Sequence, residues 1–254
     1  MDGLAEVLGE LRTKSVKLLA PKKGPRADLV QMARDNASHA FHEKARARED
    51  VDARLGALQE RLRLPTLPRR VECVDVSHTG GTDTVASIVA LLDAAPDKKR
   101  YKSFHVKRVS GGDDYSAMHE VLSRRFRRGR DGEKGWEFPD LLVVDGGRGQ
   151  LNVALEALKN LGIKNLPVAA LAKEKPNVLG EKLVDRIYLP GQKNPIELRE
   201  SHASLGILAM ARDEAHRASN ALRLKLGKKK KLTSRLDEVP GIGAKTRVRL
   251  LKAF

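Results

Sequence analysis

The chain has 254 residues, and its hydrophobic content of 41% is enough to bury one domain with small appendages, which excludes a disordered chain. Lysine and arginine number 49 against 33 aspartate and glutamate, so the formal charge is +16, and this balance favours a polyanionic partner such as nucleic acid over a merely solvated surface. The sequence has no apolar run near the roughly 20 residues of a bilayer span, no secretion signal and a single cysteine, Cys73, so we expect a soluble cytoplasmic protein without internal disulfides.

Residues 1–64 are predicted to form a helical arm or connecting region. A short apolar stretch at residues 15–20 is a candidate for a lone strand, and a long polar helical stretch follows it. Within that stretch an apolar stripe at spacings of four, three and four is typical of a helix that packs on a core: Val51, Leu55, Leu58 and Leu62. Pro65 and Pro68 end the helical pattern.

Residues 65–226 carry the pattern of one α/β domain. Apolar runs that start at Val71, at Thr84 and at Tyr101 are joined by turns rich in Gly, Asp and Pro, which predicts an antiparallel three-stranded meander. A helix is expected next, because an aspartate of the pair Asp113-Asp114 can cap its start.

The second half of this domain predicts a parallel crossover. A strand at residues 141–144, a helix at about 149–160 and a strand at 167–171 follow one another. We therefore predict an α/β fold with a mixed five-stranded sheet flanked by helices. Residues 177–199 read as an irregular hairpin insertion, and residues 201–226 read as one helix.

Two aspartates follow apolar runs that read as strands, and they are candidate metal ligands. Asp75 and Asp145 would lie where the edge of a sheet opens to solvent, so their carboxylates could share a divalent ion. Hard oxygen ligands select Mg²⁺ or Mn²⁺, and a histidine shifts the choice modestly toward Mn²⁺. We predict His216 as a third ligand or a proton-transfer group, and Asp114 as a further catalytic acid.

Each of these residues also has a structural alternative. A strand-end aspartate commonly caps the next helix, and a histidine such as His216, within an Asp-Glu-Ala-His-Arg string, is commonly exposed among charge pairs. Asp113 and Asp114 are more readily interpreted as caps than as ligands, and Asp114 is the preferred candidate of the two. Taken together, in an order that suits one fold, the residues favour the metal site.

The C-terminal part favours contact with DNA phosphates. Residues 227–233 are predicted to be a flexible basic linker, and residues 234–254 a single helix-hairpin-helix element whose Gly-Ile-Gly turn lets the backbone approach a phosphate. A solvated tail and an ordinary helix-packing unit are the alternatives. The predicted DNA-binding residues are Lys228, Lys229, Lys230, Lys231, Gly241, Ile242, Gly243, Lys245, Thr246 and Arg247.

The strings VECVDVSHTGGTDTVAS, GGDDYSAMHEVLSRRF, PDLLVVDGGRGQLNVALEAL and ARDEAHR, followed by EVPGIGAKTR, resemble the C-terminal half of UvrC, the nuclease subunit of the bacterial UvrABC excision-repair system. The resemblance runs from about residue 65 to the end of the chain. It implies an RNase H-like endonuclease that cuts damaged DNA on the 5′ side of a lesion. Its Asp, Asp, His set falls on Asp75, Asp145 and His216, and a further acidic position falls on the Asp113-Asp114 pair.

The same resemblance implies which residues shape the site and which partners to expect. The motif residues that match are Ser77, His78, Thr79, Gly146, Gly147, Gly149 and Gln150. The implied partners are damaged double-stranded DNA and its complex with UvrB. Nothing in residues 1–64 resembles the family's N-terminal nuclease domain or its UvrB-docking segment, and the chain has one helix-hairpin-helix element instead of two, so we expect a fragment or a shortened relative.

Three functions are therefore compared. The first is a metal-dependent DNA endonuclease that makes the 5′ incision of nucleotide excision repair. The second is a DNA-binding or docking module of the repair complex without autonomous cleavage, and the third is another RNase H-like nuclease such as a junction resolvase. A basic cluster is expected to line the DNA path, and the alternative is that it is only the exposed face of a helix. It comprises Arg124, Arg125, Arg127 and Arg128.

Overall fold

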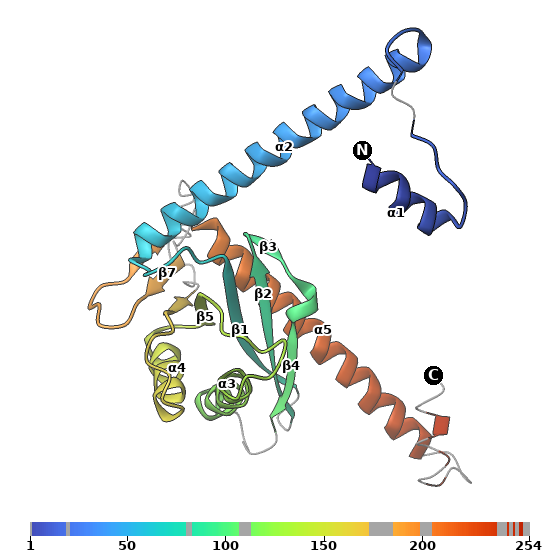
Figure 1. The fold of residues 1–254 in the computed structure, drawn as a ribbon. Helices are drawn as coiled ribbons and strands as arrows, with labels where there is room; N and C mark the ends of the chain where they lie inside the picture. Colours follow the sequence, from blue (N-terminus) through green and yellow to red (C-terminus); the bar gives the residue numbers. More distant parts are fainter. Residues whose placement is uncertain are drawn as a thin grey trace, which may run out of the picture. The chain divides into compact units, whose positions relative to one another are not determined.

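The structure is a computed structural model, and it describes residues 2–18, 21–79, 83–106, 113–172, 185–198 and 205–237, with single positions at 243, 246, 249 and 250. It divides into two compact units, Met1–Asp50 and Val51–Phe254. Helix α2 (Pro25–Leu62) runs across the boundary between them. The second unit holds the sheet (Figure 1). Every candidate site residue has a number within the range of this unit.

The first unit contains helix α1 (Asp2–Arg12) and the N-terminal part of α2. The prediction of a strand at residues 15–20 is wrong for residues 15–18, because they have no regular secondary structure. Residues 19 and 20 lie outside the described part of the chain. Helix α2 starts at Pro25, a favourable first position because proline needs no hydrogen bond there. Its N-terminal part is almost entirely exposed, as its polar sequence predicts.

The second unit is built on an eight-stranded sheet. Its spatial order is β3-β2-β1-β5-β6-β7-β8, and β4 pairs with β2. The strands are β1 (Arg70–Thr79), β2 (Asp83–Leu92), β3 (Ala95–Pro96), β4 (Lys102–Val106), β5 (Leu141–Asp145), β6 (Val168–Ala172), β7 (Asp185–Tyr188) and β8 (Ile196–Leu198). A short 3-10 helix, Lys98–Arg100, links β3 to β4.

The predicted meander and the parallel crossover are both confirmed. Strands β1, β2 and β4 pair antiparallel, whereas β5 lies parallel to β1 and β6 parallel to β5. The prediction of five strands is wrong, since the region read as a hairpin insertion contributes β7 and β8 to the same sheet, and β3 adds a two-residue edge. These strands are too short for periodicity to separate them from loops.

Helices cover both faces of the sheet (Figure 1). Helices α3 (Asp114–Arg130) and α4 (Arg148–Asn160) pack on one face, while α5 (Gly206–Asp237) and the last turns of α2 pack on the other. Successive strand residues alternate between these faces: Cys73 belongs to the core under α5, and Val74 belongs to the core under α3 and α4. The apolar stripe of α2 enters the α5 side, as predicted.

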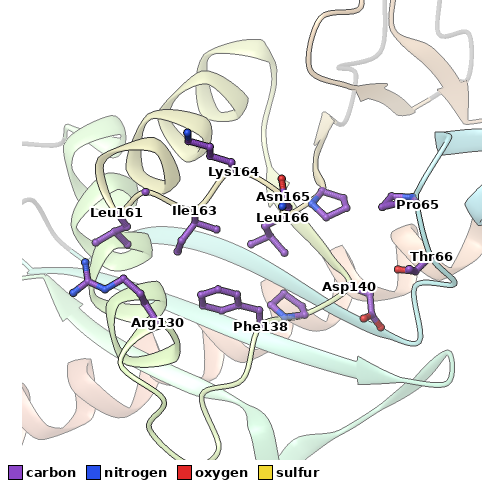
Figure 2. Close-up of a pocket in the computed structure, with 13 residues that line it drawn as sticks. Pro65, Thr66, Arg130, Phe138, Asp140, Leu161, Ile163, Lys164, Asn165 and Leu166 are labelled. Atoms are coloured by element: carbon purple, nitrogen blue, oxygen red, sulfur yellow. The ribbon is translucent and has the colours of Figure 1, made fainter.

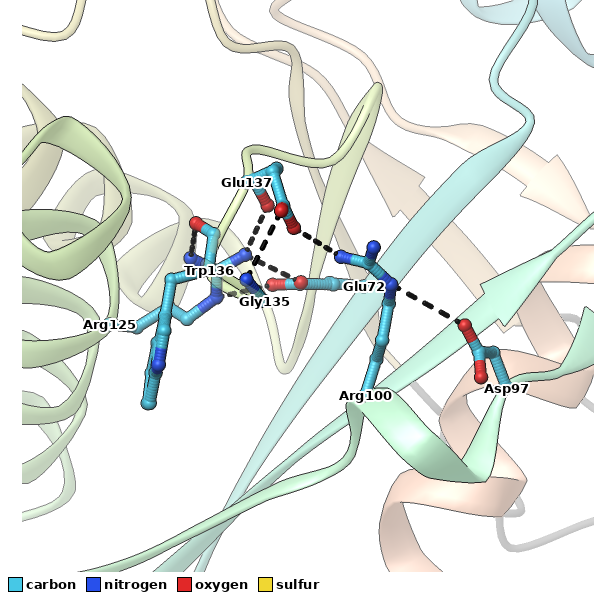
Figure 3. Close-up of polar contacts among 7 residues, drawn as sticks. All are labelled: Glu72, Asp97, Arg100, Arg125, Gly135, Trp136 and Glu137. Carbon is cyan, nitrogen blue, oxygen red and sulfur yellow. Dashed lines mark hydrogen bonds and ion pairs between the residues drawn. The ribbon is translucent and has the colours of Figure 1, made fainter. Parts of the chain in front are cut away.

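A buried ion pair joins the sheet to α3 (Figure 3). Arg125 is 1% exposed, donates to both carboxylate oxygens of Glu72 at 3.0 and 2.7 Å, and donates to the carbonyls of Trp136 and Glu137. The expectation that Arg125 lines a DNA path is therefore wrong, because all of its donor groups face inward. Arg124, Arg127 and Arg128 of the same cluster are exposed.

Helix α5 is longer than the sequence predicted. Its backbone stays helical to Asp237, so the flexible linker expected at residues 227–233 is instead part of the helix. Lysine and leucine are good helix formers, and the 228–237 stretch contains no proline or glycine to interrupt them. Among the described residues, no helix combines the length and apolar content that crossing a membrane requires.

Candidate metal centre

The register of β1 and β5 brings the two predicted aspartates together. The parallel pairing ends with Val74 beside Val144, and the next residue of each strand is Asp75 or Asp145. Both aspartates follow the alternation of Cys73 and therefore face α5. Asp145 is the last residue of β5, as predicted. Asp75 lies inside β1, which continues to Thr79 by pairing with β2, so the prediction that its strand ends there is wrong.

Helix α5 supplies the third member of the group. His216 Nε2 lies 2.7 Å from Asp145 Oδ2 and 3.8 Å from Asp75 Oδ1. The alternative interpretation of His216, as an exposed member of helical charge pairs, is wrong because its side chain faces the two carboxylates. Its neighbour Glu214 forms such a pair instead, with Arg217.

The three side chains of the candidate metal centre differ in their exposure to solvent. The side chain of Asp75 is 10% exposed, that of Asp145 22% and that of His216 40%. Burial, together with the nearby charge of Asp145, raises the pKa of Asp75 to about 6, while Ser219 and His216 act in the opposite direction. Burial also raises the pKa of Cys73 well above its usual range, which agrees with the predicted buried thiol.

This arrangement fits a divalent cation. One ligand atom from each of Asp75, Asp145 and His216 can be chosen so that all three lie within 4.8 Å of one another. Two ligand atoms that each lie about 2.1 Å from one ion are at most about 4.2 Å apart, so binding needs only a small closure of these side chains. Two carboxylates face each other at low exposure, which is unfavourable without a cation. Carboxylate oxygens suit hard divalent ions, and imidazole suits transition-metal ions.

The predicted fourth member of the site, Asp114, is not in this group. It lies in the first turn of α3 and is exposed. Its neighbour Asp113 is the N-cap residue of α3 and accepts hydrogen bonds from the backbone N–H groups of Tyr115 and Ser116, both at 3.1 Å. The capping alternative is thus confirmed for Asp113, and a catalytic role for Asp114 stays a prediction.

The turn after Asp145 explains the glycine-rich motif. Gly146 has a φ of 138°, which strongly favours glycine, and its N–H donates to the Leu171 carbonyl. Gln150 Oε1 accepts from the Gly147 N–H at 3.0 Å and so closes the start of α4. A Cβ at Gly149 would lie 2.5 Å from the hydroxyl of Tyr115, so glycine there lets α3 and α4 approach closely.

Sequence reasoning missed two buried serines beside Asp75. Ser219 lies on α5, one turn after His216, and its Oγ is 3.5 Å from the carbonyl oxygen of Asp75. Ser87 lies opposite Asp75 on β2. Serines in strands and helices are common, so only their spatial neighbours distinguish these two.

The predicted DNA-binding residues are only partly covered by the described part of the chain. The backbone at residues 228–231 belongs to α5, but the side chains there are not described. Gly243 and Thr246 are described as single exposed positions, whereas Gly241, Ile242, Lys245 and Arg247 are outside the described residues. The helix-hairpin-helix element and its DNA contacts therefore remain predictions.

A pocket of about 560 Å³ lies away from this centre (Figure 2). It is lined by Pro139 and Asp140 before β5, by Pro167 before β6 and by the segment around Ile163 that follows α4. It therefore opens at the N-terminal edge of the parallel strands, whereas Asp145 ends β5 at the opposite edge. The pocket is not part of the candidate metal centre.

Comparison with known proteins identifies the sequence pattern. Residues 59–219 match a family model described as the UvrC RNAse H endonuclease domain, and residues 1–44 match one described as the UvrC Ribonuclease H-like domain. The chain is 44% identical to UvrABC system protein C of Geobacter metallireducens and 42% identical to that of Trichlorobacter lovleyi. These alignments cover 99% and 100% of this chain, but only 41% and 42% of the two relatives.

Solved structures give more distant similarities. Endonuclease V of Ciona intestinalis, in complex with an inosine-containing 24mer DNA, has a TM-score of 0.41 and 12% identity, over 75% of this chain and 99% of that one. The catalytic domain of human Endonuclease V has a TM-score of 0.39 and 17% identity, over 74% and 98%.

Proposed function

The chain belongs to the UvrC family, and from this premise we propose that it is a metal-dependent DNA endonuclease of nucleotide excision repair. The matching family model describes an RNase H endonuclease domain, and that fold agrees with the mixed sheet and its helices. One observation carries the proposal: two aspartates and a histidine that are far apart in the sequence converge within 4.8 Å. The chain spans about two fifths of its curated relatives, so the activity of the whole protein is part of the proposal.

The residues of the centre would divide the work of phosphodiester hydrolysis. Asp75 and Asp145 would hold the ion, Mg²⁺ or Mn²⁺, which supplies a lowered pKa for the attacking water and screening of the charge that develops on the phosphate. His216 is the most exposed of the three, and its Nε2 can hold the ion or move a proton to the leaving oxygen. Asp114 is proposed as an auxiliary acid at the start of α3.

The proposed function also includes the position of the incision and the binding partners. We propose incision on the 5′ side of a lesion in double-stranded DNA, in the cytoplasm, within a complex of DNA and UvrB. The relatives' shared name, UvrABC system protein C, supports this assignment, as does the charge of +16. Contacts from the basic residues 228–231 of α5 and from the predicted helix-hairpin-helix element at residues 234–254 would hold the duplex.

A nicking assay tests the proposal. Lesion-containing duplex is incubated with the chain and the other excision proteins in Mg²⁺ or Mn²⁺. The Asp75→Ala and Asp145→Ala variants should lose 5′ nicking while DNA binding stays close to wild type. Loss of binding and of the folded circular-dichroism spectrum would instead give these aspartates a structural role.

A second candidate is a DNA-binding or docking module without autonomous cleavage. It is favoured by the formal charge of +16, which supports binding to nucleic acid whether or not the chain cuts it. The same assay decides between the two functions, since the absence of a nick with every metal and partner combination, with DNA binding retained, would establish the module. Preferential cutting of four-way junctions would indicate a junction resolvase.

A further inference from the structure

Ser87 is the residue of β2 that lies directly opposite Asp75 of β1. Opposed residues of an antiparallel pair point to the same face of the sheet. The neighbouring pair, Cys73 and Val89, belongs to the core under α5, so alternation by two places Asp75 and Ser87 on that face as well. Helix α5, which carries His216, packs across β1 and β2 here.

The hydroxyl of Ser87 is buried and unpaired. The residue is 2% exposed, and its Oγ has no hydrogen-bond partner among the described residues. A hydroxyl removed from water without a partner is unfavourable, and such groups usually bind an ordered water or a ligand. The unpaired hydroxyl next to a candidate metal ligand is the observation that points to a bound molecule.

Ser219 gives the same surroundings a second buried hydroxyl. It is 1% exposed on α5, and its Oγ lies 3.5 Å from the Asp75 carbonyl oxygen, at the outer limit of a hydrogen bond. Asp75 is thus flanked by one buried hydroxyl from β2 and another from α5. A water there would have the two or more polar partners that a buried water needs.

We propose that Ser87 is a positioning residue of the metal centre, and that its hydroxyl binds a water that bridges it to the Asp75 carboxylate. The water orients the carboxylate so that its other oxygen faces Asp145 and His216. Groups that hold metal-ligating carboxylates in this way commonly change metal affinity by about 10- to 100-fold when removed. The inference deepens the proposed function and rests on its metal centre.

Mn²⁺ binding to the full chain tests this role independently of nuclease activity. Binding is measured as the loss of the electron paramagnetic resonance signal of the free ion. Ser87→Ala should weaken Mn²⁺ binding by about tenfold. Its thermal midpoint without metal should stay close to wild type, because the variant gives up only a water-mediated hydrogen bond at a buried hydroxyl. In the nicking assay the Mn²⁺ concentration for half-maximal rate should rise, while the rate at saturating Mn²⁺ stays near wild type.

Ser103→Ala is the matched control. Ser103 lies opposite Ser87 on β4, in the same row of the sheet, but it is exposed to solvent. This variant should bind Mn²⁺ as wild type does. If Ser87→Ala also binds Mn²⁺ as wild type does, Ser87 has no positioning role.

Asp145→Ala separates failure of this inference from failure of the proposed function. If wild type binds Mn²⁺ and Asp145→Ala does not, the metal centre stands, and Ser87→Ala alone decides the inference. If wild type and Asp145→Ala bind Mn²⁺ equally, the metal centre and the role of Ser87 are both wrong.

Discussion

Asp145 and His216 are 71 positions apart in the sequence, and the Nε2 of His216 lies 2.7 Å from the Oδ2 of Asp145. One residue ends a buried strand and the other lies on the helix that crosses the same face of the sheet. Together with the adjacent Asp75, this pair forms the group of ligand atoms to which the metal centre is assigned.

Replacing His216 by alanine should slow nicking by about 10²- to 10⁴-fold, because the centre loses a ligand or a proton-transfer group. The rate at saturating Mn²⁺ is the measurement. His119→Ala is the control, since His119 is another helical histidine, which contacts Asn160 on the α3–α4 side. Equal nicking rates for His216→Ala and His119→Ala would show that His216 has no role in catalysis.

Mn²⁺ binding should weaken in acid. The pKa of Asp75 is raised to about 6, mainly by burial, so the ion must displace a proton below that pH. Affinity measured by titration should fall by about tenfold per pH unit below 6 and level off above it. An affinity that stays constant between pH 5 and pH 7 would contradict the raised pKa.

The same shift predicts the pH dependence of stability in the metal-free protein. The folded chain holds the Asp75 proton more tightly than the unfolded chain, whose value is near 3.8. Stability should therefore decrease as the pH rises from about 4 to about 6, and Asp75→Asn should lack that part of the decrease. Urea unfolding at several pH values measures the free energy of unfolding of both proteins. The same dependence of this free energy on pH in wild type and in Asp75→Asn would contradict the prediction.

Breaking the buried ion pair should destabilise the domain. Arg125→Ala leaves the Glu72 carboxylate buried without its partner, which costs about 3–5 kcal/mol of unfolding free energy. Arg127→Ala, an exposed arginine of the same helix, should change stability by less than about 0.5 kcal/mol. The double variant Glu72→Leu/Arg125→Met should recover much of the loss, and urea unfolding followed by circular dichroism compares the three.

Gly146→Ala should disturb the turn that follows Asp145. Alanine is strained at a φ of 138°, and its Cβ would lie 2.6 Å from the side chain of Gln150. The expected cost is about 1–3 kcal/mol, with weaker Mn²⁺ binding because Asp145 moves with the turn. Gly147→Ala is the control, since a Cβ there meets no atom within 4 Å. Equal stabilities would show that the turn tolerates side chains at both positions.

Removing residues 228–254 should weaken DNA binding and reduce its salt dependence. Each phosphate contact that is lost lowers the slope of log affinity against log salt by about 0.9. A binding series at several salt concentrations measures the slope for the full and the truncated chain. An unchanged slope would exclude these residues from the DNA interface.

The sequence alone determined where the main strands lie along the chain, their meander and crossover connections, and the identity of the three candidate ligands. Apolar periodicity and turn residues are local signals, so they sufficed for the meander, the crossover and the helix around His216. Asp75 and Asp145 could be selected because, together with His216, they occur in an order that suits one fold, and the resemblance to UvrC gave the same three positions.

Tertiary structure decided which side chains meet. The sequence placed Arg125 with its basic neighbours, but only packing against β1 gave it the buried partner Glu72. It likewise gave no reason to select Ser87, whose importance arises from its register opposite Asp75. Local patterns fix the face of an element, whereas its partners depend on strand order and helix placement, which are set by contacts between residues distant in sequence.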